Sequence, residues 1–145
     1  MPIRAIAYVS EAAHGLGIDA VDDRIREAGT FNISAGVTGV LLFDGSRFLQ
    51  YVEGPEDGLA VAYSRITNAA SHSRIVELGR TRTGCRNLPY WSMRLLHVEP
   101  GELQAVANGD WSSFVVRQSH DGGSLHGVEI LARVLIPFLG HPPER

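Results

Sequence analysis

The chain has 145 residues and a formal net charge of −3, with 13 basic residues, all of them arginine, against 16 acidic ones. This length favours one domain, and the lack of a basic excess argues against a general nucleic-acid or membrane-surface binder. The single cysteine, Cys85, excludes an intrachain disulfide and a multi-thiolate metal site. Because no signal peptide and no apolar stretch of membrane-spanning length is recognisable, we expect a cytoplasmic protein.

The chain begins with a predicted strand followed by a predicted helix. Residues 3–10 form a short apolar run without helical periodicity, which is typical of a buried strand. Apolar residues then recur at helical spacing over residues 18–28, with acidic residues near the start. Gly29 is the expected end of this helix, and Asn32 is then expected as a terminating or turn residue just beyond it.

A hairpin and a second helix follow. Residues 37–43 and 47–53 flank the dipeptide Asp44-Gly45, which is the strongest short-range hairpin signal in the chain. Apolar side chains over residues 59–66 then share one helical face, and a proline ahead of them suits a first turn.

The last predicted elements are two strands and a C-terminal helix. Residues 74–82 and 91–98 are predicted strands, joined by a loop over residues 84–89. The apolar spacing within residues 128–135 predicts an amphipathic helix near the C-terminus.

The order strand, helix, strand, strand, helix, strand, strand predicts an α+β fold of the ferredoxin-like class. In this arrangement two helices pack on one face of a mixed sheet, and the other face needs a cover. We expect the C-terminal helical annex to supply that cover or to lie in an oligomer interface. The expected division is a domain over residues 1–98 and an annex over residues 99–145.

Two polar side chains stand out within the apolar strands. Tyr8 lies near the end of the first strand, and Gln50 shares the face of Phe48 and Val52 at period two. A buried glutamine amide has donors and an acceptor that must be satisfied. Tyr8 and Gln50 could simply form hydrogen bonds with each other or with the backbone. These two residues alone do not decide between this structural role and a functional one.

Other patterns favour ordinary structural roles. Gly15 and Gly17 suggest a dinucleotide fingerprint, but the third glycine is missing and a hairpin follows where a parallel crossover is required. The six histidines lack metal-ligand spacing. Arg80, Arg82 and Arg86 are expected on a solvated face. Because no nucleophile motif is evident, we do not expect an enzyme.

Taken together, these residues resemble the BLUF family, the flavin-binding blue-light sensors. The resemblance covers residues 3–98 and implies the ferredoxin-like fold, with the isoalloxazine ring of non-covalently bound FAD or FMN between the two helices. The matching segments are Tyr8-Val9-Ser10, Asn32, Val37-Thr38-Gly39, Phe48-Leu49-Gln50, Glu53-Gly54, Arg65-Ile66 and Trp91-Ser92-Met93.

The resemblance also implies roles for individual residues. Tyr8 would give an electron and a proton to the photoexcited flavin, and Gln50, between Tyr8 and the N5/O4 edge of the flavin, would rearrange its amide on illumination. Asn32 and Arg65 would bond the polar pyrimidine end of the ring. The remaining implied site residues are Ile25 and Ile66 on the ring faces, Phe48 and His72 in the pocket, and Trp91 and Met93 as relays on the last strand.

Three positions depart from the family pattern. Phe31 stands where members often have His or Asn, while Ala69 and Ser71 replace an Asp and an Arg that commonly follow the second helix. These changes bear on flavin affinity and on the choice between FMN and FAD, and His72 remains.

The resulting interpretation is a blue-light photoreceptor that forms a homo-oligomer and signals to an unidentified effector protein. One alternative is a flavin-free adaptor on the same fold with a decayed pocket. A second is a small acylphosphatase-like enzyme, which would need an arginine in the loop after the first strand; residues 10–17 contain none.

Overall fold

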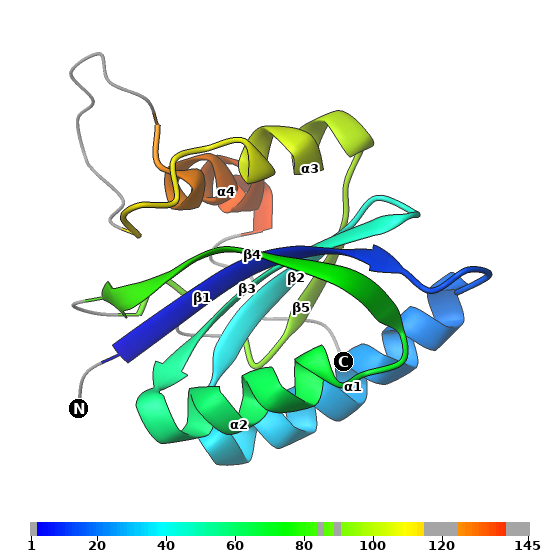
Figure 1. Ribbon diagram of the computed structural model, residues 1–145, viewed down its shortest axis with the longest axis horizontal. Coiled ribbons are helices and arrows are strands. Elements are labelled where there is room, and N and C mark those ends of the chain that lie inside the picture. The colour runs from blue at the N-terminus through cyan, green and yellow to red at the C-terminus, as the bar shows by residue number, and fades with distance from the viewer. Residues whose placement is uncertain (1–2, 84–85, 89–90, 115–124, 139–145) are drawn as a thin grey trace.

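The computed structural model describes residues 3–83, 86–88, 91–114 and 125–138, and it contains a five-stranded sheet in the order β4-β1-β3-β2-β5 (Figure 1). The neighbours are antiparallel except for β2 and β5, which are parallel. The strands are β1 (Ile3–Ala12), β2 (Thr38–Phe43), β3 (Arg47–Pro55), β4 (His72–Thr83) and β5 (Arg94–His97). The helices are α1 (Ile18–Ala35), α2 (Glu56–Thr67), α3 (Pro100–Ala107) and α4 (Gly127–Leu135), with a 3₁₀ turn at Ile136–Phe138.

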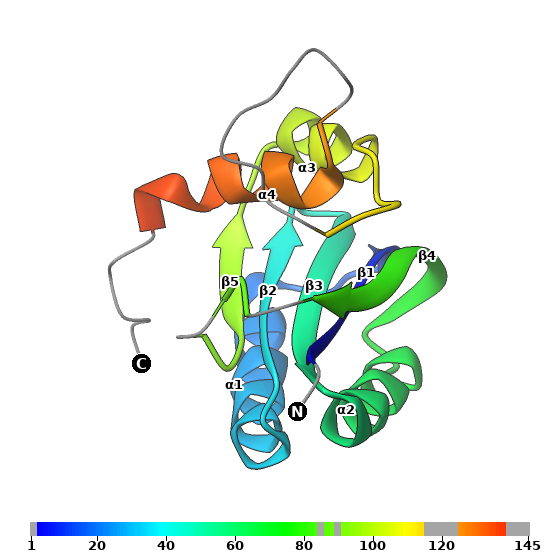
Figure 2. The same cartoon turned by 90° about the vertical axis from the view of Figure 1, so that its left-hand side faces the viewer.

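Helices cover both faces of the sheet. Helices α1 and α2 lie against one face and α3 and α4 against the other, as Figures 1 and 2 show. The alternation of strand side chains divides the core accordingly: Phe48 and Val52 pack toward α1 and α2, and Leu49 and Tyr51 pack toward α3 and α4. The expected α+β, ferredoxin-like architecture is confirmed, with the annex on the second face.

The pairing of β1 with β3 fixes the position of the two polar residues. The antiparallel register sets Tyr8 directly opposite Gln50. The hairpin between β2 and β3 turns at Asp44-Gly45 as predicted: Gly45 has φ 100°, and the Asp44 carboxylate accepts the Arg47 N–H at 2.7 Å. Because the turn holds the register of β3, Gln50 faces α1 and α2 and not the opposite layer.

The first helix is longer than predicted. Gly29 does not end α1, which continues to Ala35 and is terminated by Gly36 in the left-handed conformation (φ 73°). Gly29 is buried in the helix, where an added Cβ would lie 3.1 Å from the Ser92 hydroxyl, so close packing accounts for the glycine. Asn32 is therefore a residue of the helix and not of a turn beyond it.

The C-terminal part differs from prediction in two ways. The strand expected over residues 91–98 is limited to β5, so Trp91 and Met93 precede the strand. Helix α3 was not predicted; it begins after a capping box in which Glu99 N–H donates to the Glu102 carboxylate at 3.0 Å. Helix α4 occupies the predicted segment.

Arg86 corrects the interpretation of the three arginines as one solvated face. Its guanidinium is partly buried and donates to the Gly36 carbonyl oxygen and to Thr38 Oγ1, the latter at 3.0 Å. Positions 84, 85 and 89 of the predicted loop lie outside the described residues. Within the described ranges, no helix is long and apolar enough to cross a membrane.

Candidate functional site

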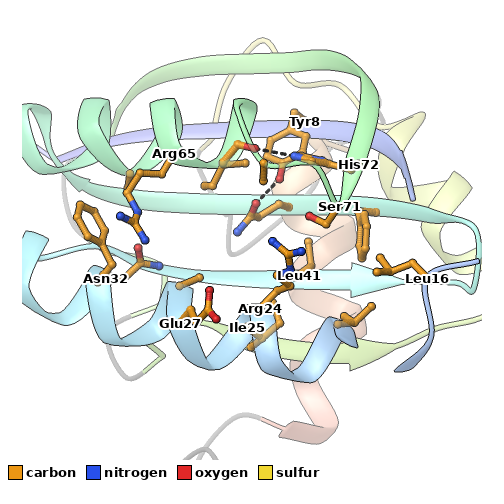
Figure 3. Close-up of a pocket in the computed structure, with 18 residues that line it drawn as sticks. Tyr8, Leu16, Arg24, Ile25, Glu27, Asn32, Leu41, Arg65, Ser71 and His72 are labelled. Atoms are coloured by element: carbon orange, nitrogen blue, oxygen red, sulfur yellow. Dashed lines mark hydrogen bonds between the residues drawn. The ribbon is translucent and has the colours of Figure 1, made fainter. Parts of the chain in front are cut away.

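A cavity of about 370 Å³ lies between α1 and α2 above the sheet (Figure 3). Its volume falls within the usual range for small-molecule sites. The cavity brings together eight of the site residues named from the sequence, and they come from β1, β3, β4, α1 and α2. They are Tyr8, Ile25, Asn32, Phe48, Gln50, Arg65, Ile66 and His72.

Tyr8 and Gln50 form a buried hydrogen-bonded pair on the floor of the cavity. The exposed fractions of Tyr8 and Gln50 are 2% and 4%. The Tyr8 hydroxyl donates to Gln50 Oε1, and Gln50 Nε2 lies 3.3 Å from Met93 Sδ as a donor. Burial raises the pKa of the Tyr8 phenol well above its usual range, and the nearby Tyr63 hydroxyl adds to the effect. The phenol is therefore neutral, and Gln50 is held at both ends of its amide.

Asn32 lies at the end of the cavity formed by the last turns of α1. Its side chain is 3% exposed, and its Nδ2 donates to the Ser92 carbonyl oxygen at 2.7 Å. The bond joins α1 to the segment that precedes β5. No other described residue is bonded to the second amide hydrogen or the side-chain oxygen of Asn32, so both are available to a ligand.

His72 is held at both ring nitrogens. Its Nε2 lies 2.7 Å from the Ile66 carbonyl oxygen, and its Nδ1 lies 2.6 Å from Ser10 Oγ. Because a carbonyl can only accept, Nε2 carries a proton, and in the neutral ring Nδ1 accepts from the serine hydroxyl. His72 thus ties the end of α2 to β1 and β4 at one side of the cavity.

The walls of the cavity are flat and largely apolar. Ile25 of α1 and Ile66 of α2 line it from the two helices, and Phe48 lines it from the sheet. The Arg65 guanidinium lies 4.3 Å from the centre of the Phe31 ring, so the phenylalanine at this position holds Arg65 by a cation–π contact.

Trp91 and Met93 lie on different sides of the sheet. Met93 packs with the cluster that faces α1 and α2, where its sulfur meets Gln50. Trp91 is buried in the other cluster, with residues of α3 and α4. We expected both residues on the last strand, but both precede β5. Met93 does lie beside Gln50, whereas Trp91 packs on the opposite side of the sheet.

The sequence interpretation did not include Arg24 and Glu27, which line the same cavity from α1. Figure 3 shows the Arg24 side chain rising from α1 into the space between the two helices. The signal was available in the spacing, because Arg24 lies two helical turns before Phe31 and therefore on the same flank of α1.

The residues of the cavity fit a flavin. Isoleucines from the two helices suit the faces of a planar ring, and the amides of Asn32 and Gln50 suit its polar edges. Tyr8 lies behind Gln50, as an electron donor to such a ring would. Among the described residues, no three His, Cys, Asp or Glu side chains cluster as metal ligands.

Comparisons with known proteins agree with this geometry. The family described as "BLUF: Sensors of blue-light using FAD" matches residues 3–94. The chain is 31% identical over 117 residues to the blue light- and temperature-regulated antirepressor BluF of Escherichia coli K12, a match that covers 77% of this chain and 29% of BluF.

Two solved structures extend the comparison. The dark-state structure of the BLUF protein BlrB has 26% identity and a TM-score of 0.64, and the match covers 73% of this chain and 79% of BlrB. The photo-activated state of BlsA has 20% identity and a TM-score of 0.68, and the match covers 100% of this chain and 99% of BlsA. The BlsA match shows the same fold. The chain itself spans less than a third of BluF.

Proposed function

Because the chain belongs to the BLUF family of blue-light sensors that use FAD, we propose that Tyr8 and Gln50 form its photochemical switch and that a partner protein reads the state of the switch. The observation that carries this proposal is the buried hydrogen bond from the Tyr8 hydroxyl to Gln50 Oε1 at the floor of the flavin cavity. A flavin bound there supplies a chromophore for blue light, which in its excited state is a strong one-electron oxidant.

Tyr8 supplies the electron in this scheme. Burial raises the pKa of its phenol, so the hydroxyl keeps its proton in the dark. Oxidation makes the phenol strongly acidic, and its proton then leaves along the hydrogen bond to Gln50. Since the Tyr8 hydroxyl is hydrogen-bonded only to the neutral Gln50 amide among the described residues, loss of both the electron and the proton avoids leaving an uncompensated positive charge in an apolar site. The electron and the proton both return to Tyr8 afterwards, because a reversible light response consumes no electron donor.

Gln50 stores the change. A half-turn of its amide, or its conversion to the imidic tautomer, exchanges donor and acceptor without moving a net charge. A half-turn would present Nε2 to the Tyr8 oxygen and remove the hydrogen from Met93 Sδ, which receives it in the present geometry. The switch therefore alters the bonding of a residue outside the cavity.

Met93 and Trp91 are suited to carry that change outward. Met93 contacts the Gln50 amide on one side of the sheet, and Trp91, two residues earlier, is packed with α3 and α4 on the other. The backbone of Trp91 is fixed to β2, since its carbonyl accepts the Gly39 N–H at 2.8 Å. A movement of this short segment reaches both layers, and we assign Trp91 and Met93 the role of relay.

The output follows from this division of the chain. We assign flavin sensing to residues 1–98 and the output to the annex of residues 99–145, acting in the cytoplasm through a homo-oligomer that contacts an effector protein. In this scheme the chain senses light and has no catalytic activity of its own. BluF is an antirepressor, and its name supports a protein as effector.

Visible absorption spectra of the purified full chain, before and after blue illumination, test the switch. The flavin band should move reversibly to the red. Gln50→Leu and Tyr8→Phe should keep flavin and lose that shift. Tyr63→Phe is the matched control, because its ring lies 5.9 Å from that of Tyr8 but its hydroxyl is bonded to Glu77.

A normal shift in Gln50→Leu or Tyr8→Phe would remove that residue from the switch. A preparation that stays colourless after incubation with riboflavin, FMN and FAD would favour the flavin-free adaptor instead.

A further inference from the structure

Arg24 is a cation of the flavin cavity without a bond inside the described part of the protein. It lines the cavity from α1, is solvent-exposed, and has no hydrogen-bond or ion-pair partner among the described residues. Figure 3 shows its guanidinium between α1 and α2, away from the end where Asn32 and Arg65 lie. An arginine in this position keeps its whole donor set for a ligand.

The other basic groups of the cavity are engaged. The Arg65 guanidinium is stacked on the Phe31 ring at 4.3 Å, two turns of α1 away from Arg24. The two nitrogens of His72 are bound to Ser10 and to the backbone of Ile66. Among the described residues that line the cavity, Arg24 is therefore the one cation whose position no contact fixes. An anion that enters the cavity can bind to it.

The chemistry of a flavin places its anionic part near Arg24. N5 and N10 lie on opposite edges of the central ring, so a flavin that presents N5 to Gln50 sends its N10 substituent away from the sheet. That substituent is the ribityl chain, which carries the phosphate in FMN and FAD. It would pass between α1 and α2, and Arg24 lines the cavity from α1.

We propose that Arg24 binds the phosphate of the flavin nucleotide and so selects phosphorylated flavins over riboflavin. The inference rests on the proposed function, because it needs a flavin in the cavity with N5 toward Gln50. The aliphatic stem of Arg24 would lie along the bound flavin, with the exposed guanidinium at the solvent side, as is common for long basic side chains. A guanidinium binds two phosphate oxygens at once, which gives a directed contact at an exposed site.

Acidic residues near Arg24 set the strength of the site. Glu27 lines the same cavity one turn further along α1, and Asp22 and Asp23 directly precede Arg24 in the helix. Glu27 repels a phosphate and competes for Arg24, so it lowers the affinity for phosphorylated flavins. Salt should also weaken the contact between Arg24 and the phosphate, since the interaction of exposed charges is screened over about 8 Å at physiological ionic strength.

Equilibrium dialysis of the full chain tests the proposal without any light response. The purified protein is exchanged against riboflavin or FMN, and the dissociation constant of each flavin is measured at low and high salt. Arg24→Gln should weaken FMN binding about tenfold and leave riboflavin binding unchanged, as expected for loss of one charge-assisted contact. Glu27→Gln should tighten FMN binding alone. Arg26→Gln, at an exposed position of the same helix outside the cavity, is the matched control.

The outcomes separate the two proposals. Equal loss of FMN and riboflavin affinity in Arg24→Gln, or unchanged FMN affinity, would overturn the phosphate contact while the flavin site stands. A preference for FMN that persists in Arg24→Gln and disappears in Arg65→Gln would give the phosphate to Arg65. If the unaltered protein binds neither flavin, the proposed function itself fails. In the unaltered protein, high salt should reduce the difference between the dissociation constants of FMN and riboflavin. In Arg24→Gln, high salt should have little effect on that difference.

Discussion

Glu53 is a buried carboxyl whose ionisation should be visible in the stability of the protein. Its side chain is 0% exposed. It accepts the N–H groups of Asn87, at 2.9 Å, and of Leu88, and the Tyr51 hydroxyl lies 3.3 Å away as a third donor. Burial raises the pKa of Glu53 above its ordinary value of 4.5, because the cost of desolvating the carboxylate outweighs these hydrogen bonds and the Arg86 charge.

The direction of the pH dependence follows from that shift. A raised pKa means that the folded state binds the Glu53 proton more tightly than the unfolded state. The contribution to stability is complete below pH 4.5 and is lost as the pH rises through the folded-state pKa. Between the unfolded-state and folded-state pKa values, each unit of rising pH lowers the free energy of unfolding by up to about 1.4 kcal/mol, the value for one linked proton.

Glu53→Gln should remove this dependence. The amide has one oxygen where the carboxylate has two, so one donor of the 86–88 segment loses its acceptor, at a cost of about 1–3 kcal/mol that does not vary with pH. Denaturant unfolding of both proteins, at fixed flavin concentration and at several pH values from about 4 to about 8, gives the difference in unfolding free energy. The stability of the unaltered protein relative to Glu53→Gln should fall as the pH rises and then become constant.

A second variant gives the same reasoning an independent test. Tyr51→Phe removes a hydroxyl that favours the ionised form, so it should extend the falling part of the curve to higher pH. A stability difference between the unaltered protein and the Glu53→Gln variant that is the same at every pH, or that grows as the pH rises, would refute the raised pKa.

Two further pairs of substitutions test the packing of the two layers. Gly58→Ala in α2 should destabilise the protein by about 1–3 kcal/mol in thermal unfolding, because its Cβ would overlap the Ala35 carbonyl of α1; Gly101→Ala in α3, whose Cβ meets nothing within 4 Å, should not. Trp91→Ala should cost about 3–5 kcal/mol, whereas Trp91→Phe should cost much less in denaturant unfolding, because the buried Trp91 Nε1–H has no partner among the described residues. Equal losses in either pair would contradict the packing described.

The central strands could be predicted from the sequence because their signals are local. Period-two alternation in residues 48–52 assigns each side chain to a face, and the Asp44-Gly45 turn fixes the register of β2 against β3. The pairing of β1 with β3, which brings Gln50 opposite Tyr8, is a long-range contact that no local signal sets. The cavity residues followed from these strands together with the family resemblance. Their assembly in one cavity depends on helix packing, which sequence spacing alone does not determine.

The wrong boundaries have physical reasons in distant contacts. Gly29 weakens a helix locally, but α1 continues through it because the glycine lets the helix approach Ser92 closely. Helix α3 has only two buried apolar side chains, Leu103 and Val106, so its periodic signal is weak, although the Pro100 and Glu102 pattern at its start was readable. The segment before β5 stays bonded to β2 through the Trp91 carbonyl but is not part of the strand. Its Trp91 side chain packs with the annex, a long-range contact that local patterning does not reveal.

The distribution of charge in the cavity explains why an amide is suited to be the switch. The floor consists of groups that are neutral in the dark, a phenol, a carboxamide and a thioether, all of them buried. A charged intermediate that persisted there would be costly, because neither Tyr8 nor Gln50 is hydrogen-bonded to a charged group among the described residues. Exchange of donor and acceptor on Gln50 changes the hydrogen-bond pattern at constant charge, so the lit state survives without new solvation. The charged residues Arg24 and Arg65 lie at the rim, where they can bind the cofactor without perturbing the switch.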